Sequence, residues 1–317
     1  MQDAHSREVK MLQKCSRARR ENVASDILCS KCSSSKNGKL SGDLNMKIGI
    51  FDSGFGGLSV LHEAYHQLPN EEYFFYADRK HVPYGTKTKE QIIEYAEEIA
   101  GFLIDKGIQA LVVACNTATS VAIENLRHKY SIPILGMEPA VKPAVEGTDG
   151  KKILVIATPV TVREDKLKNL LKKVDGEHRV DLLPLPGLVE FAEKGIFDGQ
   201  AVKEYMLQEL SGYDLDDYCA LVLGCTHFNY FKPVYREIFG NKIALVDGNG
   251  GTVRHLADVL SLDNISCDNR KIEIQDIDEM KKVYKTTYFI SGDEIEDEQM
   301  LKLITKYHNR LEFVRNI

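Results

Sequence analysis

Residues 110–120 read ALVVACNTATS, so that a short apolar run ends in Cys115 and small polar residues follow it. Residues 220–229 read ALVLGCTHFN and repeat the arrangement around Cys225. Continuous apolar strands of this kind are typical of parallel sheets that helices cover on both faces. The two stretches therefore predict two buried strands, each with a thiol at its carboxyl end.

From Met46 onward, strand-like and helix-like segments alternate. A helix is expected from about Leu58, and residues 89–107 carry an apolar stripe at helical spacing that Gly107 ends. The helix after Cys115 is expected over residues 121–130. The other predicted strands of this part of the chain are residues 47–53, 72–78 and 132–137. Strands that alternate with helices indicate an α/β fold.

The pattern then restarts, because KKILVIATPVTV at 151–162 parallels MKIGIFDSGFGG at 46–57. The spacing from the opening strand to the cysteine-bearing strand is also similar, 63 residues from Lys47 to Ala110 and 68 from Lys152 to Ala220. We interpret this as an internal duplication. It predicts two pseudo-symmetric domains, each a mainly parallel sheet flanked by helices. Ligands of such sheets bind beyond the carboxyl ends of the strands, so the active site is expected in the cleft between the domains.

Composition narrows the class of protein. The chain has 317 residues, 43% of them hydrophobic and 28% charged, which is ordinary for a globular protein. No apolar run is long enough for a membrane span, and no signal-peptide core opens the sequence. Outside residues 1–45 there are 32 basic and 42 acidic residues, which argues against nonspecific nucleic-acid binding. Seven scattered cysteines fit a reducing compartment, so we expect a cytoplasmic protein.

Residues 1–45 differ from the rest of the chain. They carry nine Lys and Arg against five Asp and Glu, and they lack a sustained apolar period, so a disordered extension is expected. Cys29 and Cys32 have CxxC spacing and, with His5 and Cys15, could supply four zinc ligands. This spacing matches no ordinary zinc module. We predict no metal there.

The two strand-end thiols allow four interpretations. Free cysteine is often inert core packing. A disulfide would need Cα atoms within about 7 Å and would close the cleft. Metal binding with His227 lacks a second close ligand. The interpretation that we favour is two-base proton transfer, in which one sulfur takes a proton from a substrate carbon and the other returns one to the opposite face.

Neighbouring groups suit that chemistry. A thiol with an ordinary pKa near 8.5 must lose its proton to act as a base, and His227, two residues from Cys225, could receive or share it. Asp52 ends the first strand and should reach the same rim of the cleft as Cys115. Short donors for a carboxylate-bearing substrate follow the strand ends at Ser53, Asn116, Thr117 and Thr226.

No cofactor signature accompanies these residues. Gly54 and Gly56 match the start of GxGxxG, but the third position is Ser59 and no acidic residue follows at the usual distance. No lysine pattern indicates pyridoxal phosphate. We expect a reaction without a cofactor and without a metal.

Five motifs, IGIFDSGFGGLSVL, VPYGTKT, ACNTAT, GMEPAVKPA and GCTHF, occur in this order and resemble bacterial glutamate racemase. TTYFISGD at 286–293 also resembles that family's C-terminal segment, so the resemblance spans residues 46–293. It implies interconversion of L- and D-glutamate, which supplies D-glutamate for peptidoglycan. One departure is Phe228-Asn229-Tyr230 after Cys-Thr-His, where the family commonly has Tyr-Pro-Leu.

The resemblance also implies roles for individual residues. Cys115 corresponds to the thiol that deprotonates D-glutamate and Cys225 to the one that deprotonates L-glutamate. Asp52 and His227 resemble the assisting acid/base residues, and Glu193 a further carboxylate of the second domain. The implied substrate contacts are Asp52, Ser53, Tyr84, Gly85, Asn116, Thr117, Thr119, Thr226 and His227. The function of Glu138 stays open.

The family's topology implies a first domain of residues 46–137 plus 251–317 and a second of residues 138–250. A homodimer that binds glutamate, without a nucleic-acid or membrane partner, is expected. Two alternatives remain open: an aspartate or other amino-acid racemase of the same superfamily, and a non-catalytic amino-acid-binding or redox protein. Substrate profiling and solvent hydrogen exchange separate them.

Overall fold

The structure is a computed structural model that describes residues 45–148, 150–262, 266, 279 and 285–317. The predicted extension and its CxxC pair lie outside the described residues, as does Cys267. Within the described part, no helix is both apolar enough and long enough to cross a membrane.

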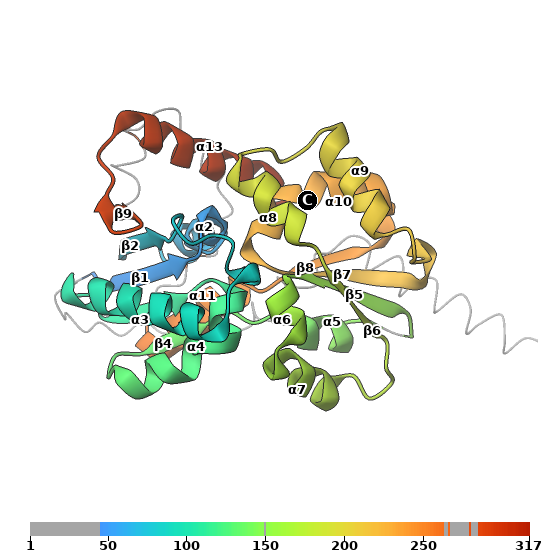
Figure 1. Cartoon of the computed structure of the whole chain (residues 1–317), viewed down its shortest axis with the longest axis horizontal. Coiled ribbons are helices and arrows are strands. Elements are labelled where there is room, and N and C mark those ends of the chain that lie inside the picture. Colours follow the sequence, from blue (N-terminus) through green and yellow to red (C-terminus); the bar gives the residue numbers. More distant parts are fainter. Residues whose placement is uncertain (1–44, 149, 263–265, 267–278, 280–284) are drawn as a thin grey trace, which may run out of the picture. The chain divides into compact units, whose positions relative to one another are not determined.

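Two sheets organise the described chain, one in each half of Figure 1. The first sheet has the order β10-β9-β2-β1-β3-β4 and is parallel except for β10. Its strands are β1 (Lys47–Asp52), β2 (Glu72–Ala77), β3 (Ala110–Val113), β4 (Ile134–Gly136), β9 (Thr286–Ile290) and β10 (Asp293–Glu294). The second sheet has the order β6-β5-β7-β8 and is parallel throughout. Its strands are β5 (Lys152–Ala157), β6 (Val180–Pro184), β7 (Tyr218–Gly224) and β8 (Ala244–Asp247).

The repeated strand order confirms the predicted fold class. The order β2-β1-β3-β4 of the first sheet matches β6-β5-β7-β8 of the second, so that β3 and β7 occupy equivalent places. Cys115 and Cys225 follow these two strands. The first sheet is extended by β9, which pairs with β2 although more than 200 residues separate them in the chain. The domain boundaries at residues 137 and 250 stay a prediction.

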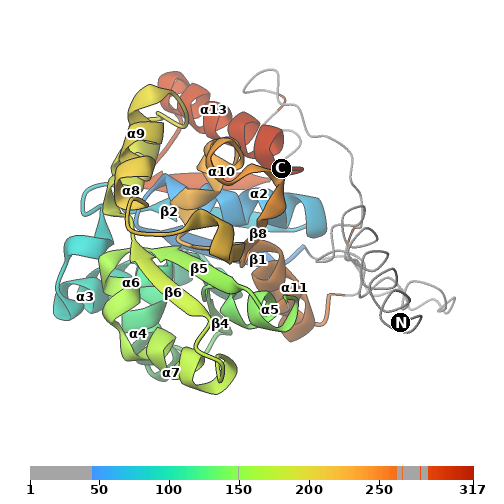
Figure 2. The same cartoon turned by 90° about the vertical axis from the view of Figure 1, so that its right-hand side faces the viewer.

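Helices cover the faces of both sheets, as Figures 1 and 2 show. Around the first sheet they are α2 (Leu58–Gln67), α3 (Lys89–Asp105), α4 (Asn116–Lys129), α11 (Asn249–Leu260) and α13 (Glu298–Val314). Around the second sheet they are α5 (Val141–Glu146), α6 (Pro159–Arg163), α7 (Asp165–Val174), α8 (Pro186–Glu193), α9 (Gln200–Glu209) and α10 (Lys232–Phe239). Short 3₁₀ segments are η2 (Phe55–Gly57), η3 (Tyr84–Thr86), η4 (Leu215–Asp217), η5 (Thr226–Phe231) and η6 (Gly240–Lys242).

One helix begins earlier than its sequence pattern indicates. The helix expected from residue 121 starts at Asn116, because the Cys115 sulfur accepts the Ala118 N–H at 3.4 Å and caps the first turn. Asn and Thr are weak helix formers in that turn, so the apolar pattern appears only later. As a result, α4 presents its N-terminal N–H groups where the thiol lies.

The core continues from one half of the chain to the other. A single cluster of buried side chains includes Leu58 and Tyr65 of α2, Phe228 of η5, and Ile304 and Tyr307 of α13. Tyr307 also donates a hydrogen bond to the carbonyl of Ala192 at the end of α8, 2.7 Å away. Helix α13 therefore packs against elements of both sheets.

Candidate active site

The two thiols lie at the carboxyl ends of β3 and β7 and are almost buried. Cys115 is 5% exposed and Cys225 is 7% exposed, and both are free thiols. Asp52 connects them, because it accepts hydrogen bonds from Ser53, which contacts the Cys115 sulfur, and from Thr226, which follows Cys225. The structure thus brings together the two cysteines that the repeated stretches predicted to face one another.

On the Cys115 side, a hydroxyl connects the thiol to a carboxylate. The Cys115 S–H donates to Ser53 Oγ over 3.7 Å, and the Ser53 hydroxyl donates to Asp52 Oδ1 over 3.0 Å. Asp52 has no exposed surface and also accepts hydrogen bonds from the Gly54 N–H and the Thr226 hydroxyl. Thiol, hydroxyl and carboxylate form a short path along which a proton can leave the sulfur.

On the Cys225 side, an imidazole takes the place of the hydroxyl. Nδ1 of His227 lies 3.7 Å from Cys225 Sγ, and Nε2 of His227 lies 2.8 Å from Glu193 Oε1. The Phe55 N–H donates to that same Glu193 oxygen over 2.6 Å, and Arg79 holds the other one at 3.1 Å. Thiol, imidazole and carboxylate form the second path.

The ring of His227 has two competing partners at Nε2. The Gly56 N–H points at this nitrogen from 3.2 Å, and Glu193 Oε1 lies at 2.8 Å. A neutral ring with a bare Nε2 accepts from Gly56, whereas a protonated ring donates to Glu193. The site therefore accommodates both protonation states of His227, which a group that stores a proton requires.

Burial raises the pKa of both Cys115 and Asp52. Burial, reinforced by the negative charge of Asp52, raises the pKa of the Cys115 thiol to about 12. Burial also raises the pKa of Asp52 above its usual range, although the charge of His227 and the Thr226 hydrogen bond oppose it. Cys115 is thus a protonated thiol at neutral pH.

Burial disfavours the charged forms of His227 and Glu193, but the hydrogen bonds of the two residues outweigh the effect of burial on their pKa values. The hydrogen bonds to Cys225 and Glu193 raise the pKa of His227 well above its ordinary range. The hydrogen bond from His227, joined by its charge, lowers the pKa of Glu193 below its ordinary range. We therefore assign an ion pair between protonated His227 and ionised Glu193 at neutral pH.

Of the predicted substrate contacts, Asn116 has a side-chain oxygen without a partner among the described residues, whereas Thr117 and Gly85 lie against Thr158. Asn116 Oδ1 is buried and has no hydrogen-bond partner in the part of the chain that the structure describes, so it is an acceptor that a ligand can use. Thr117 connects the elements of the two sheets, because its hydroxyl in α4 lies 2.8 Å from the hydroxyl of Thr158, which follows β5. Gly85 also approaches Thr158, because a Cβ at this glycine would lie 3.0 Å from the Thr158 Cβ.

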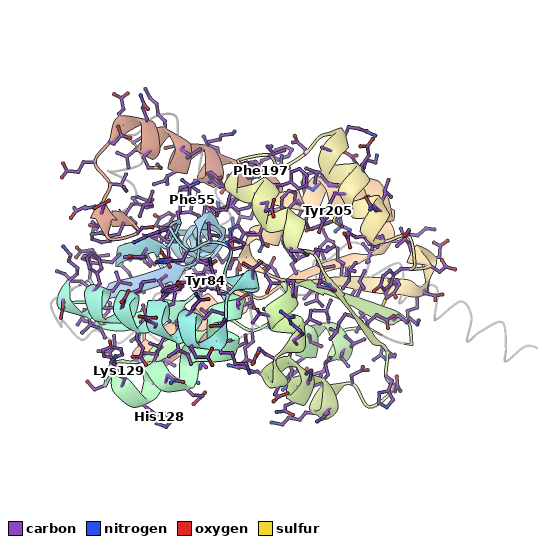
Figure 3. All side chains as sticks on the ribbon, in the orientation of Figure 1. Phe55, Tyr84, His128, Lys129, Phe197 and Tyr205 are labelled. Carbon is purple, nitrogen blue, oxygen red and sulfur yellow. The ribbon has the colours of Figure 1, made fainter. Side chains whose placement is uncertain are left out.

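Two other predicted contacts are engaged within the first half. The Tyr84 hydroxyl donates to Asp78 Oδ2 over 2.7 Å, and its ring is buried near the middle of the molecule (Figure 3). The Thr119 hydroxyl donates to the Val113 carbonyl and accepts the Met137 N–H, both at 3.0 Å. Thr119 therefore joins the ends of β3 and β4.

Sequence reasoning overlooked several partners of these residues. Arg79 and Asp78 follow β2, and their roles depend on Glu193 and Tyr84, which a sequence pattern does not place beside them. The internal duplication could have identified Thr158, because Thr158 follows β5 as Ser53 follows β1. Aligning the two repeats places Thr158 at the carboxyl end of its strand, as it does Ser53.

Comparison with known proteins identifies the family. A family model described as Asp/Glu/Hydantoin racemase matches residues 58–256. Glutamate racemase of Lachnospira eligens is 47% identical over 274 residues, which cover 86% of this chain and all of that protein. The crystal structure of glutamate racemase from Campylobacter jejuni superposes with a TM-score of 0.66 and 32% identity, covering 82% of this chain and 97% of that one.

A second solved structure has its ligands bound. The crystal structure of Escherichia coli glutamate racemase in complex with L-glutamate and the activator UDP-MurNAc-Ala superposes with a TM-score of 0.67. Its identity is 26%, and the match covers 79% of this chain and 99% of that one. Family match, relatives and fold agree, and the chain belongs to the glutamate racemases of the Asp/Glu/hydantoin racemase family.

Proposed function

We propose that this protein interconverts L- and D-glutamate by transferring protons between Cα and the two thiols. The observation that supports this most is the pair of proton paths that converge on one site, Cys115–Ser53–Asp52 and Cys225–His227–Glu193. Each path ends in a carboxylate, so each sulfur can pass its proton on and recover it. Two-base chemistry requires such a pair on opposite faces of the substrate.

In the direction from L to D, the Cys225 thiolate takes the Cα proton and Cys115 S–H delivers one to the opposite face. The cycle leaves Cys225 protonated and Cys115 as a thiolate. Exchange through His227 and through Ser53 then restores the starting state. The reverse direction uses the same groups with their roles exchanged, as microscopic reversibility demands.

Substrate binding can bring a positive charge to the Cys115 thiol. Asn116 Oδ1, which has no hydrogen-bond partner among the described residues, is placed to accept a hydrogen bond from an ammonium group. The N-terminal N–H groups of α4 favour a carboxylate. A cation that enters beside Cys115 would lower the pKa of its thiol, which burial and Asp52 raise to about 12.

The remaining functional predictions rest on the family. We propose that the D-glutamate serves peptidoglycan synthesis. Cytoplasmic location and a homodimer also stay predictions, and light scattering of the purified chain measures the oligomeric state.

The direct test incubates the full chain with L-glutamate or D-glutamate in D₂O without added cofactor. NMR follows Cα deuterium, and optical rotation follows configuration. Inverted product that carries deuterium supports the proposal. Exchange with aspartate but not glutamate would move the protein to another racemase of the superfamily. No exchange with any amino acid would leave a binding or redox protein.

Replacing Asp52 by Asn should make the protein more stable and less active at neutral pH. Because burial raises the pKa of Asp52, ionised Asp52 costs stability, and that cost appears as pH rises through its folded pKa. The side chain at position 52 carries no charge in D52N, so the pKa of Cys115 should fall below its wild-type value. We expect about a 10²-fold loss of kcat. Thermal unfolding and the pH dependence of Cys115 alkylation measure the two effects, and an unchanged Cys115 titration would contradict the assignment.

Replacing Glu193 by Gln should lower the pKa of His227, since the negative partner of the ring is removed. We expect kcat to fall about 10- to 10²-fold as the protonated ring becomes less stable. NMR titration of the His227 ring reports the pKa directly. The matched control is E190Q, an exposed carboxylate on the same helix, which should change neither quantity. A His227 pKa that is equal in E193Q and wild-type protein would refute the ion pair.

A further inference from the structure

A second cluster of chemically competent side chains lies between α2 and α13, away from the two thiols. His62 and His66 lie one turn apart on α2, and Glu312 approaches from α13. Nε2 of His62 and Nε2 of His66 lie 2.8 Å and 2.9 Å from the same atom, Glu312 Oε2. The ligand atoms of all three residues fall within 4.8 Å of one another.

The cluster is buried, and the racemisation chemistry does not use it. The side chains of His62, His66 and Glu312 are each at most 4% exposed. A buried carboxylate and two imidazoles carry a desolvation cost that apolar side chains of similar size would avoid. A group of this kind at the contact of two helices calls for an explanation beyond packing.

The local sequence is one that metals use. Residues 62–66 read HEAYH, an HExxH sequence on a helix, which places two imidazoles on one helix face. In open metalloprotease sites the Glu of this motif acts as a general base. Here Glu63 Oε1 instead accepts a hydrogen bond from Gln67 over 2.6 Å, and His62, His66 and Glu312 are all buried. The arrangement favours a structural role over a hydrolytic one.

A second layer of hydrogen bonds supports the orientation of His62. Its Nδ1 lies 3.3 Å from Nδ1 of His308, and Nε2 of His308 lies 3.3 Å from the Tyr288 hydroxyl. Metal-bound histidines usually donate their other N–H to a carboxylate, a backbone carbonyl or water, and here the His308 ring takes that place. With Nε2 of His62 on a metal, its Nδ1–H donates to His308, which donates to Tyr288. Without a metal the same bonds run in reverse, and His62 donates to Glu312.

We propose that His62, His66 and Glu312 form a structural Zn²⁺ site that fastens α13 to α2. Two imidazoles and a carboxylate are ligands that zinc prefers, at about 2.0–2.2 Å. Tetrahedral ligand atoms at such distances stand about 3.4 Å apart. The two N···O contacts of 2.8 and 2.9 Å are shorter than this, whereas the two imidazole nitrogens lie up to 4.8 Å apart. Metal binding therefore requires the Glu312 carboxylate to retreat by about 0.5 Å and the two imidazoles to move closer together. Its second oxygen, or a water molecule, completes the coordination. This proposal departs from the expectation, drawn from the sequence, that the protein has no metal site.

The test uses the full chain, stripped with a chelator and then titrated with Zn²⁺ alone. We expect one equivalent to bind per chain and the Tm to rise by roughly 5 °C, with EDTA reversing the rise. X-ray absorption of the zinc-loaded protein should show only N and O neighbours at about 2.0–2.2 Å, without sulfur at about 2.3 Å. The E312Q and H66Q variants should lose at least tenfold in affinity. The matched control H128Q removes an exposed histidine of α4, labelled in Figure 3, and should bind as wild type does.

Three results would overturn the proposal. The wild-type chain could bind no zinc. Sulfur neighbours, lost together with the zinc in a C29S/C32S double variant, would assign the metal to the CxxC pair. Undiminished affinity in E312Q and H66Q would place the metal elsewhere. If either variant does not fold, the neighbours seen in the zinc-loaded wild-type chain still decide the question. Racemase activity is measured separately, so failure here leaves the proposed function untouched.

Discussion

Replacing Cys115 or Cys225 by alanine should abolish racemisation while leaving hydrogen exchange at Cα for one enantiomer only. The C115A variant retains the Cys225–His227–Glu193 path, which removes the proton of L-glutamate and returns deuterium from solvent to the same face. The C225A variant retains the Cys115–Ser53–Asp52 path and should exchange D-glutamate alone. We expect kcat/KM for racemisation to fall by about 10³-fold or more in each variant.

Hydrogen exchange at Cα, and not the rate of racemisation, is the measurement that distinguishes the two sulfurs. Free L- and D-glutamate have equal free energies, so kcat/KM must be equal in the two directions for the wild-type protein and for every variant. A loss confined to one direction therefore cannot appear in kcat/KM. It can appear only in proton exchange without inversion, which does not require the second sulfur.

The control for both variants is C219A, which removes the thiol of β7 that donates to the Lys152 carbonyl and lies outside both proton paths. It should racemise as wild type does. Equal exchange of both enantiomers by C115A, or by C225A, would mean that one base serves both faces. In that case the assignment of one sulfur to each enantiomer would be wrong.

Replacing Gly56 by alanine should reduce kcat by about 10²-fold, although Gly56 has no reactive group. A Cβ at this position would lie 2.4 Å from His227 Nδ1 and 2.4 Å from Thr226 Oγ1, both of which are buried. His227 would have to move away from Cys225, or η2 would have to move away from η5. We also expect the free energy of unfolding to fall by about 1–3 kcal/mol, as for other overpacked sites.

The matched control is G251A, because a Cβ at Gly251 would meet no atom within 4 Å among the described residues outside its own helix backbone. That glycine lies in α11, so alanine should leave activity unchanged and add up to about 1 kcal/mol of stability. Steady-state kinetics and chemical unfolding of the two variants measure the contrast. If G56A had the kcat of the wild type, the close approach of Gly56 to His227 would not be needed for the reaction.

The sequence predicted the parts of the site that depend on local pattern. Apolar runs that end in Cys115 and Cys225, and the restart of the pattern at residue 151, were enough to indicate two similar parallel sheets. Their strand orders match. Because side chains at the carboxyl ends of parallel strands share one edge, the sequence also indicated that Asp52 and Ser53 lie near Cys115. Their hydrogen-bonded path to the sulfur is the local consequence.

What the sequence alone determined is therefore the alternation of elements, the duplication and the strand-end place of each thiol, since these follow from periodicity within short segments. Only the tertiary structure decided which side chains meet across the chain. Thr226 reaches Asp52 over 174 residues, Glu193 reaches His227 over 34, and Glu312 reaches His62 over 250. The two histidines of the HExxH sequence at 62–66 can be read from the sequence, but only the packing of α13 brings the Glu312 carboxylate to them. The physical reason is that such contacts depend on how helices pack, and a single sequence does not record the packing.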